Sequence, residues 1–206
     1  MKIAPSMLAA LEIDMPVEKA LNEIRACDFV HLDMMDGRFV KKTVTFEKEM
    51  KKMENSKIPI DMHLMVNEPD ILVKKYGDIC EMISFHMEAP VYHLDIIDSI
   101  KASGSVAGIA LNPETEIEKI NPFLKKLDFV LVMSVAPGKC GQAFLPSSLE
   151  KVRGLKKSGI KIEIDGGINE KNFSDVLRSG AGIAVMGSAI FNKNPVKENI
   201  KKFSGV

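Results

Sequence analysis

The chain has 206 residues, enough for one large domain with a substantial hydrophobic core. Hydrophobic residues make up 46% of it and charged residues 27%, which excludes a disordered chain and is typical of a soluble globular protein. The formal net charge is zero, and no stretch approaches the roughly 20 apolar residues of a membrane span, so we expect neither nucleic acid nor a membrane as a partner.

The first residues, Met1 to Ser6, lead directly into strand-like sequence, so we expect no signal peptide. The three cysteines, Cys27, Cys80 and Cys140, are far apart and odd in number, and they have neither zinc-ligand spacing nor a plausible disulfide framework. These features together predict a protein of the reducing cytoplasm.

Apolar, strand-like runs alternate with amphipathic helical stretches along the whole chain. The predicted strands cover residues 2–6, 28–33, 58–65, 80–86, 105–111, 127–132, 160–165 and 182–186. The predicted helices cover residues 16–25, 46–55, 68–76, 92–103, 116–124, 146–158, 170–179 and 195–203. Because parallel strands need a crossover helix between them, eight such units indicate an α/β protein. We predict a single (β/α)8 TIM barrel over residues 1–206, with an open, doubly wound sheet as the alternative.

Polar residues and glycines gather where the predicted strands end, and in a barrel of this kind the working face is that carboxyl end. The polar residues are Ser6, His31, Asp33, His63, His86, Asn112 and Asp165. The glycine clusters are Gly138-Lys139-Cys140-Gly141, Gly166-Gly167 and Gly187-Ser188. A barrel with a purely structural role has no need for this gathering, so the sequence predicts a functional site at this rim.

Two of the predicted strands carry a histidine and an aspartate two residues apart. Alternate side chains of a strand share a face, which aligns His31, Asp33 and Met35 on one strand and Asp61, His63 and Met65 on the other. Either pair alone is typical of a polar strand end, but the matched pairs favour a divalent metal ion. The candidate ligands are His31, Asp33, His63 and Asp165, and they suit zinc, iron(II), manganese or cobalt. Asp61 lies deeper and His86 lies at the end of another strand, so we expect both to support the site from behind.

Asp33 and Asp165 also form a candidate acid–base pair, because they arrive from different sides of the barrel mouth. One carboxylate can remove a proton next to a carbonyl while the other supplies a proton to the opposite face, and a metal stabilises the enediolate between them. Two bases of this sort invert a stereocentre, whereas one base with a neutral acid would isomerise the substrate. The glycines Gly166, Gly167 and Gly187 let backbone N–H groups approach an anion, which predicts a phosphate site. The alternative is that these glycines only form tight turns.

The motifs at this rim occur in a specific order and spacing. They are IAPS (3–6), HLDMMDG (31–37), DMHLMV (61–66), FHMEA (85–89), ALNPET (110–115), VMSV (132–135), PG (137–138), GQAF (141–144), IDGGI (164–168) and GSAIF (187–191). In these motifs the chain resembles the ribulose-phosphate 3-epimerase family of ketose-phosphate epimerases, nearly from end to end.

The resemblance implies a barrel of the ribulose-phosphate-binding type that interconverts D-ribulose 5-phosphate and D-xylulose 5-phosphate by 1,1-proton transfer at C3. It implies one divalent metal ion, a small phosphorylated ketose as substrate, and a homo-oligomer. By motif position, His31, Asp33, His63 and Asp165 would bind the metal, and Asp33 and Asp165 would be the acid–base pair. Substrate contacts would come from Ser6, His63, Gly138, Lys139, Cys140, Gly141, Gly166, Gly167, Gly187 and Ser188. The methionines at the reaction centre would be Met35, Met65 and Met133.

Two loops on the working face depart from the family pattern. After the second predicted strand the chain reads GRFVKK (37–42), and the later loop has Ala136, Lys139 and Cys140 at positions where other residues are usual. Whether Arg38, Lys41, Lys42, Lys139 and Cys140 alter specificity stays open. D-Allulose 6-phosphate is the alternative substrate, and a non-catalytic sugar-phosphate-binding protein is the alternative function. The intact histidine and aspartate set favours an enzyme.

Overall fold

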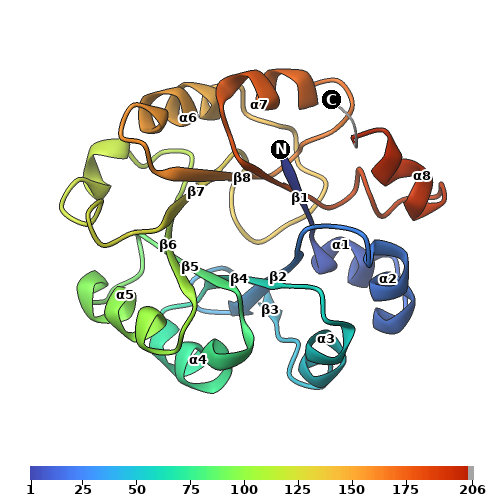
Figure 1. Ribbon diagram of the computed structural model, residues 1–206, viewed down its shortest axis with the longest axis horizontal. Coiled ribbons are helices and arrows are strands. Elements are labelled where there is room, and N and C mark those ends of the chain that lie inside the picture. Colours follow the sequence, from blue (N-terminus) through green and yellow to red (C-terminus); the bar gives the residue numbers. More distant parts are fainter. Residues whose placement is uncertain (204–206) are drawn as a thin grey trace.

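The computed structural model describes residues 1–203 and shows a closed ring of parallel strands surrounded by helices (Figure 1). The ring consists of β1 (Lys2–Pro5), β2 (Val30–Asp36), β4 (Ile60–Met65), β5 (Met82–His86), β6 (Val106–Leu111), β7 (Phe129–Met133), β8 (Lys161–Asp165) and β9 (Ile183–Met186). Hydrogen bonds join the strands in the order β1-β9-β8-β7-β6-β5-β4-β2-β3, where β3 (Thr43–Val44) is a short strand outside the ring. A parallel bridge between Ser6 and His31 closes the ring between β1 and β2. The predicted (β/α)8 barrel is therefore confirmed, and the open sheet is not formed.

Helices return the chain between the strands and cover the outside of the ring (Figure 1). They are α1 (Met7–Glu12), α2 (Val17–Ile24), α3 (Met50–Ser56), α4 (Pro69–Tyr76), α5 (His93–Ala102), α6 (Ser148–Lys156), α7 (Phe173–Ser179) and α8 (Val196–Lys201). Two 3-10 helices, η1 (Gly77–Ile79) and η2 (Ile117–Ile120), complete the set in the described residues. In α2 the buried residues Val17, Ala20, Leu21 and Ile24 follow helical spacing, which is the amphipathic pattern that the sequence predicts.

Three local elements differ from the prediction. The helix predicted at 116–124 is only the short η2, because Pro122 lacks the backbone N–H that an α-helix needs. Helix α1 was not predicted as a unit, since four of its six residues are buried and leave no polar face to reveal its period. The two-residue β3 (Thr43–Val44), which pairs antiparallel with β2, is too short for a sequence pattern.

The barrel strands are buried on both faces, as expected for a parallel sheet covered by helices. All six residues of β4 are buried. Inside the barrel the ring of Phe129 fills the space beside Gly108, where an added Cβ would lie 2.3 Å from the ring. This close packing fills the interior below the carboxyl ends of the strands.

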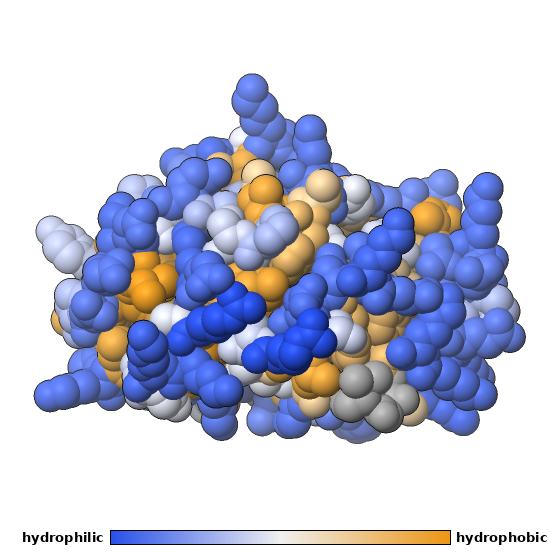
Figure 2. Space-filling view, turned by 90° about the horizontal axis from the view of Figure 1, so that it is seen from above, coloured by the Kyte–Doolittle hydropathy of each residue, from blue (hydrophilic) through white to orange (hydrophobic). Residues whose placement is uncertain are grey.

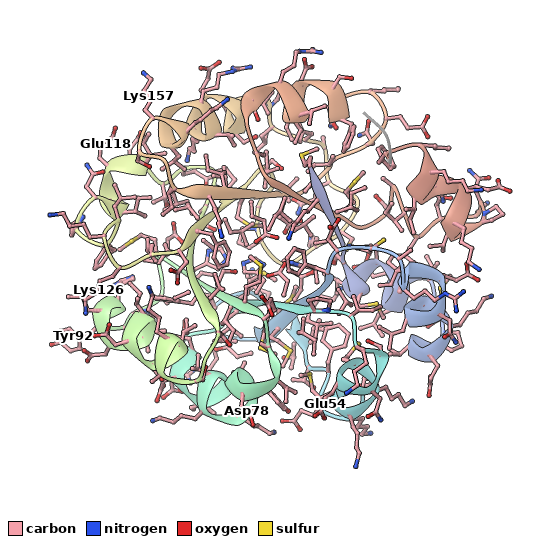
Figure 3. All side chains as sticks on the ribbon, viewed as in Figure 1. Glu54, Asp78, Tyr92, Glu118, Lys126 and Lys157 are labelled. Carbon is pink, nitrogen blue, oxygen red and sulfur yellow. The ribbon has the colours of Figure 1, made fainter. Side chains whose placement is uncertain are left out.

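Charged and polar side chains cover the outside of the molecule. Glu54, Asp78, Tyr92, Glu118, Lys126 and Lys157 project outward from the ring (Figure 3). The side view is mainly hydrophilic, with small apolar areas between the polar side chains (Figure 2). No helix within residues 1–203 is both long and apolar enough to pass through a membrane.

Candidate active site and metal centre

Strand register brings the polar pairs of β2 and β4 together. His31 is the register partner of Asp61, and Asp33 is the partner of His63. On the other side of the ring Asp165, the last residue of β8, is the partner of Met133 on β7. Partners in parallel strands point to the same face, so residues far apart in the sequence meet inside the barrel mouth.

The four predicted metal ligands form one cluster. His31, Asp33, His63 and Asp165 each offer a ligand atom, and these atoms all lie within 4.8 Å of one another. Asp33 Oδ1 lies 3.1 Å from His63 Nδ1 and 3.4 Å from His31 Nε2. His31 Nε2 is buried and has no hydrogen-bond partner among the described residues. A buried nitrogen that points at carboxylates without a hydrogen bond fits a cation site, and these nitrogen and oxygen donors could hold a divalent metal ion.

A buried carboxylate lies behind His31. Asp61 Oδ2 is 2.5 Å from His31 Nδ1, and both side chains are fully buried. Burial lowers the pKa of His31, but the charges of Asp61 and Asp33 outweigh this effect and raise it well above its usual value. Burial and then the charge of Asp61 raise the pKa of Glu163, which lies beside Asp61 in the barrel interior. The expected supporting role of Asp61 is confirmed as a hydrogen bond, whereas Glu163 was not singled out from the sequence.

Another imidazole lies behind His63. His63 Nε2 is 2.9 Å from His86 Nε2, and His86 Nδ1 is 3.1 Å from Glu88 Oε2. His86 is therefore placed behind the cluster and not in it, as the sequence predicts. Glu88 was not singled out, because it follows β5 in a loop where no strand period reveals its direction.

The two candidate acid–base residues have opposite pKa shifts. Burial raises the pKa of Asp33, but His31 and His63 lower it more, so the pKa lies well below its usual value. Burial and then the charge of Asp33 raise the pKa of Asp165 to about 7. The hydroxyl of Ser6 donates a hydrogen bond of 2.8 Å to Asp33 Oδ2. One carboxylate is thus held ionised while the other can carry a proton near neutral pH, which is the separation that acid–base catalysis requires.

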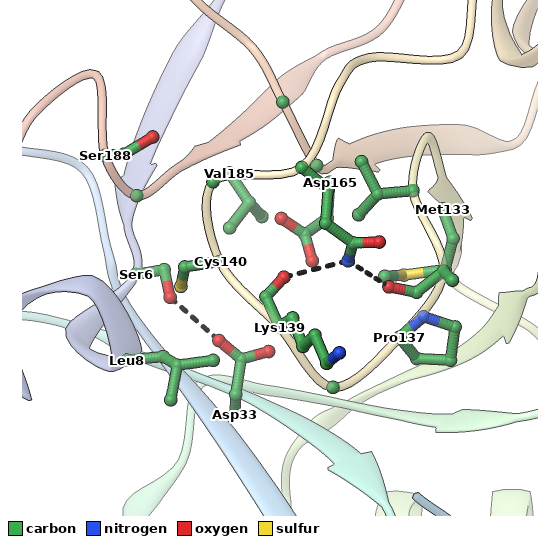
Figure 4. A pocket seen from close by; sticks show the side chains of 18 of the residues that line it. Ser6, Leu8, Asp33, Met133, Pro137, Lys139, Cys140, Asp165, Val185 and Ser188 are labelled. Carbon is green, nitrogen blue, oxygen red and sulfur yellow. Dashed lines mark hydrogen bonds between the residues drawn. The ribbon is translucent and has the colours of Figure 1, made fainter. Parts of the chain in front are cut away.

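A pocket opens above this cluster, with about 510 Å³ of empty space including its mouth (Figure 4). The predicted site residues that line it are Ser6, Asp33, Met35, Met65, Met133, Gly138, Lys139, Cys140, Gly141, Asp165, Gly166, Gly167, Gly187 and Ser188. His31 and His63 do not line the pocket, because both are fully buried beneath it. The lining residues that were not predicted are Leu8, Val135, Ala136, Pro137, Gln142, Ile168 and Val185. Most of these are apolar wall residues, which carry no chemical signal in a sequence.

The glycines after β8 and β9 pack closely and still line the pocket. Gly167 has φ +64, and an added Cβ would lie 2.6 Å from Phe144 N, so the loop at 142–144 passes directly over it. An added Cβ at Gly187 would lie 3.1 Å from Ala9 Cβ. Tight packing thus accounts for part of the glycine pattern, and the pocket-lining backbone remains available to an anion.

The loop after β7 is tied to itself over the pocket. Gln142 Nε2 donates hydrogen bonds to the carbonyl oxygens of Ala136, at 2.6 Å, and Lys139, at 3.0 Å. Burial and the charge of Asp33 raise the pKa of Cys140, so this cysteine is a thiol and not a reactive thiolate.

The unusual basic residues of the two loops are placed differently. Arg38 forms a surface ion pair of 2.7 Å with Glu68, and Lys42 forms one of 2.8 Å with Glu12. Lys41 is exposed. Among the described residues that line the pocket, Lys139 is the one basic side chain. Of these residues, Lys139 is therefore the one placed to contact an anionic substrate.

Solved structures show the same fold at low sequence identity. A 3-hexulose-6-phosphate synthase superposes with a TM-score of 0.69 at 15% identity, covering 98% of both chains. A mutant tryptophan synthase alpha-subunit from Pyrococcus furiosus superposes with a TM-score of 0.74 at 14% identity, covering 100% of this chain and 98% of the other. At this identity the similarity concerns the fold alone.

Sequence comparisons find much nearer relatives. Residues 2–191 match the ribulose-phosphate 3 epimerase family. The ribulose-phosphate 3-epimerase of Schizosaccharomyces pombe is 37% identical, covering 97% of this chain and 90% of that protein. Proteins with the same name are 37% identical in Methanocaldococcus jannaschii and 35% identical in Escherichia coli K12, covering 97% and 96% of this chain and 88% and 92% of those proteins. The chain belongs to the ribulose-phosphate 3-epimerase family of carbohydrate isomerases.

Proposed function

We propose that the protein is a metal-dependent epimerase that interconverts D-ribulose 5-phosphate and D-xylulose 5-phosphate by two-base proton transfer at C3. The observation that carries the proposal is the pair Asp33 and Asp165 on the lining of one pocket, with pKa values shifted in opposite directions. A site that only bound a sugar phosphate would need neither the second carboxylate nor this shift.

In the proposed reaction Asp33, held ionised, removes the C3 proton from one face of the ketose. Asp165, whose pKa is about 7, supplies a proton to the opposite face, and the roles exchange in the reverse direction. The electrons of the broken C–H bond pass into an enediolate and return to C3 when the new C–H bond forms. The hydrogen bond from Ser6 keeps the carboxylate of Asp33 in one orientation.

His31, Asp33, His63 and Asp165 would hold one divalent ion, of zinc, iron, manganese or cobalt. When bound, the ion supplies the positive charge that stabilises the enediolate oxygens. Met35, Met65 and Met133 line the same pocket and offer no competing acid or base. Their apolar side chains limit the access of water to the reacting carbon.

The phosphate group would lie against the backbone at Gly166-Gly167 and Gly187-Ser188, with Lys139 supplying a positive charge. Gly138, Cys140 and Gly141 would cover the substrate from the loop after β7. These contacts recognise a phosphate and not a chain length, so a hexulose phosphate such as D-allulose 6-phosphate is the second candidate substrate. A single domain, a cytoplasmic location and a homo-oligomer stay predictions.

Proton exchange in D2O tests the proposal. The metal-loaded protein is incubated with D-ribulose 5-phosphate and, in parallel, with D-allulose 6-phosphate, and deuterium at C3 is followed by NMR. We expect deuterium to enter C3 together with the epimer, faster for the pentulose. Asp33→Asn and Asp165→Asn should each lower turnover by on the order of 10²–10⁴-fold. The control is Asp98→Asn, which changes an exposed ion pair on α5. Normal turnover in either site variant contradicts the two-base assignment.

A further inference from the structure

The two ring nitrogens of His63 face different groups. Nδ1 lies 3.1 Å from Asp33 Oδ1 in the candidate metal cluster, and Nε2 lies 2.9 Å from His86 Nε2. Both rings are completely buried. Only one proton fits between two nitrogens at that separation, so one ring donates and the other accepts. A neutral histidine carries its proton on one nitrogen only, and the direction of this hydrogen bond therefore decides whether His63 Nδ1 can bind a cation.

Glu88 sets that direction. Its Oε1 accepts hydrogen bonds from the backbone N–H of Asn112, at 3.2 Å, and from the hydroxyl of Thr115. Its Oε2 lies 3.1 Å from His86 Nδ1. Burial raises the pKa of Glu88, but the hydrogen bonds from His86 and Thr115 lower it more, so the group is a carboxylate at neutral pH. Because a carboxylate only accepts, the proton of His86 is on Nδ1.

Glu88, His86 and His63 thus form a hydrogen-bonded relay, which continues from His86 inward to His63. A buried, neutral His86 with its proton on Nδ1 has a free lone pair on Nε2 and accepts a hydrogen bond there. Complete burial disfavours the charged form of an imidazole, which agrees with a neutral ring. His63 must then carry a proton on Nε2, so Nδ1, which faces Asp33, is the nitrogen that a metal ion can occupy.

The outer end of the relay is held rigidly. Lys151 Nζ donates to the carbonyl oxygens of Asn112, at 3.0 Å, Pro113, at 2.6 Å, and Thr115, at 2.5 Å. Lys151 belongs to α6, so the segment 112–115, whose Asn112 and Thr115 donate to Glu88, is tied to that helix. The ring of Phe39, from the loop after β2, also packs against the ring of His86, with centroids 4.7 Å apart.

We infer that Glu88, acting through His86, sets the tautomer of His63 and so keeps its Nδ1 available to bind the metal ion. Glu88 and His86 are positioning residues, since neither offers a ligand atom to the cluster that would hold the ion. The inference rests on the proposed metal site but not on the identity of the sugar phosphate. It gives the loop after β5, which carries Glu88, and the loop after β6, which holds it, a function in metal binding at a distance.

Glu88→Gln tests the inference with almost no change in side-chain volume. The backbone N–H of Asn112 can only donate, so the amide oxygen must face it and the amide NH2 must face His86 Nδ1. His86 would then carry its proton on Nε2, and His63 would carry its proton on Nδ1, where it competes with the metal. The matched control is Glu114→Gln, which removes the same charge from an exposed position in the neighbouring loop after β6.

The first measurement is the protonation of the ring nitrogens by 15N NMR in the metal-free and zinc-loaded protein. The chain has only four histidines, and a His93→Gln variant removes the one that lies outside both this relay and the metal cluster, which leaves His31, His63 and His86. In the wild type and in Glu114→Gln we expect a proton on His63 Nε2 and on His86 Nδ1. In metal-free Glu88→Gln we expect it on His86 Nε2 and His63 Nδ1, with zinc affinity lower by about 10–100-fold in competition with a chelator.

The outcomes separate the inference from the proposed function. A wild-type His63 without a proton on Nε2 overturns the inference whatever the activity. The same holds for a Glu88→Gln variant that keeps the wild-type pattern and zinc affinity. If the tautomers reverse as expected but the loaded wild type exchanges no proton with either ketose phosphate, the inference stands and the proposed reaction fails. The wild-type spectrum also decides the matter if Glu88→Gln does not fold.

Discussion

The two candidate metal-binding histidines are supported in different ways. His31 has a carboxylate directly behind it, Asp61 at 2.5 Å, and the pair is completely enclosed in the barrel interior. His63 has a neutral imidazole behind it, and the charge lies one step further out on Glu88, whose side chain is 25% exposed.

The difference shows how one barrel can combine two supports, a fully buried one behind His31 and a partly solvent-exposed one behind His63. A buried ion pair cannot exchange its partner for water, so a change at Asp61 leaves a charge without compensation. The support of His63 ends in a loop near solvent, where a change can be partly replaced by water. Changes on the His31 side should therefore affect folding, whereas changes on the His63 side should mainly affect metal binding.

Asp61→Ala is expected to have the largest effect. It leaves the buried His31 without the carboxylate that it contacts and should lower the free energy of unfolding by about 3–5 kcal/mol. Urea unfolding of the metal-free protein measures this, with Asp78→Ala, an exposed position, as the control. A loss below about 1 kcal/mol would mean that the two supports are energetically alike.

Metal affinity should depend on pH through the protons that Asp165 and His31 carry in the metal-free protein. In the metal-free protein Asp165 keeps its proton up to about pH 7, and Asp61 and Asp33 raise the pKa of His31. A cation must displace these protons, so affinity should rise as pH increases from 5 to 8, by up to about tenfold per pH unit for each proton displaced. Calorimetry in buffers of different ionisation enthalpy should detect proton release. Asp165→Asn should show a shallower dependence, and an unchanged slope would contradict this assignment.

Thr115→Val should have a smaller effect, confined to the His63 side. The hydroxyl of Thr115 is one of two donors to Glu88 Oε1, and the backbone of Asn112 remains as the other. We expect a loss of about 1 kcal/mol in the free energy of unfolding and a few-fold loss in metal affinity. Thr45→Val, at an exposed position, is the control. A larger loss of stability than in Asp61→Ala would reverse the comparison.

Glu163→Gln should have the smallest effect, although its side chain is completely buried. Burial and the charge of Asp61 raise the pKa of Glu163, so at pH 7 a neutral amide would replace a neutral acid of the same size. We expect the free energy of unfolding to change by less than about 1 kcal/mol. A loss above about 3 kcal/mol would show that Glu163 is ionised and belongs to the charge network of His31.

Local patterns in the sequence determined the barrel and the identity of its candidate metal-binding residues. Strand and helix periods repeat within about ten residues, and the two-residue spacing of His31 and Asp33 fixes their common face before any folding is considered. The fold class and the residues of the cluster could therefore be predicted. Helix α1 could not be predicted, because most of its residues are buried and no polar face reveals a helical period. The shortness of η2 could not be predicted either, because its helical pattern continues beyond the point where Pro122 ends the helix.

Only the tertiary structure decided what supports those residues. Glu163 is on the same strand as Asp165, but its contact with Asp61 depends on how the ring of strands closes. The relay from His63 through His86 to Glu88 joins β4, β5 and the loop after β5, and its direction depends on a backbone N–H at Asn112 in the loop after β6. Side-chain period is a local property of the chain, whereas a hydrogen bond between distant segments depends on register, curvature and closure, which no short stretch of sequence contains.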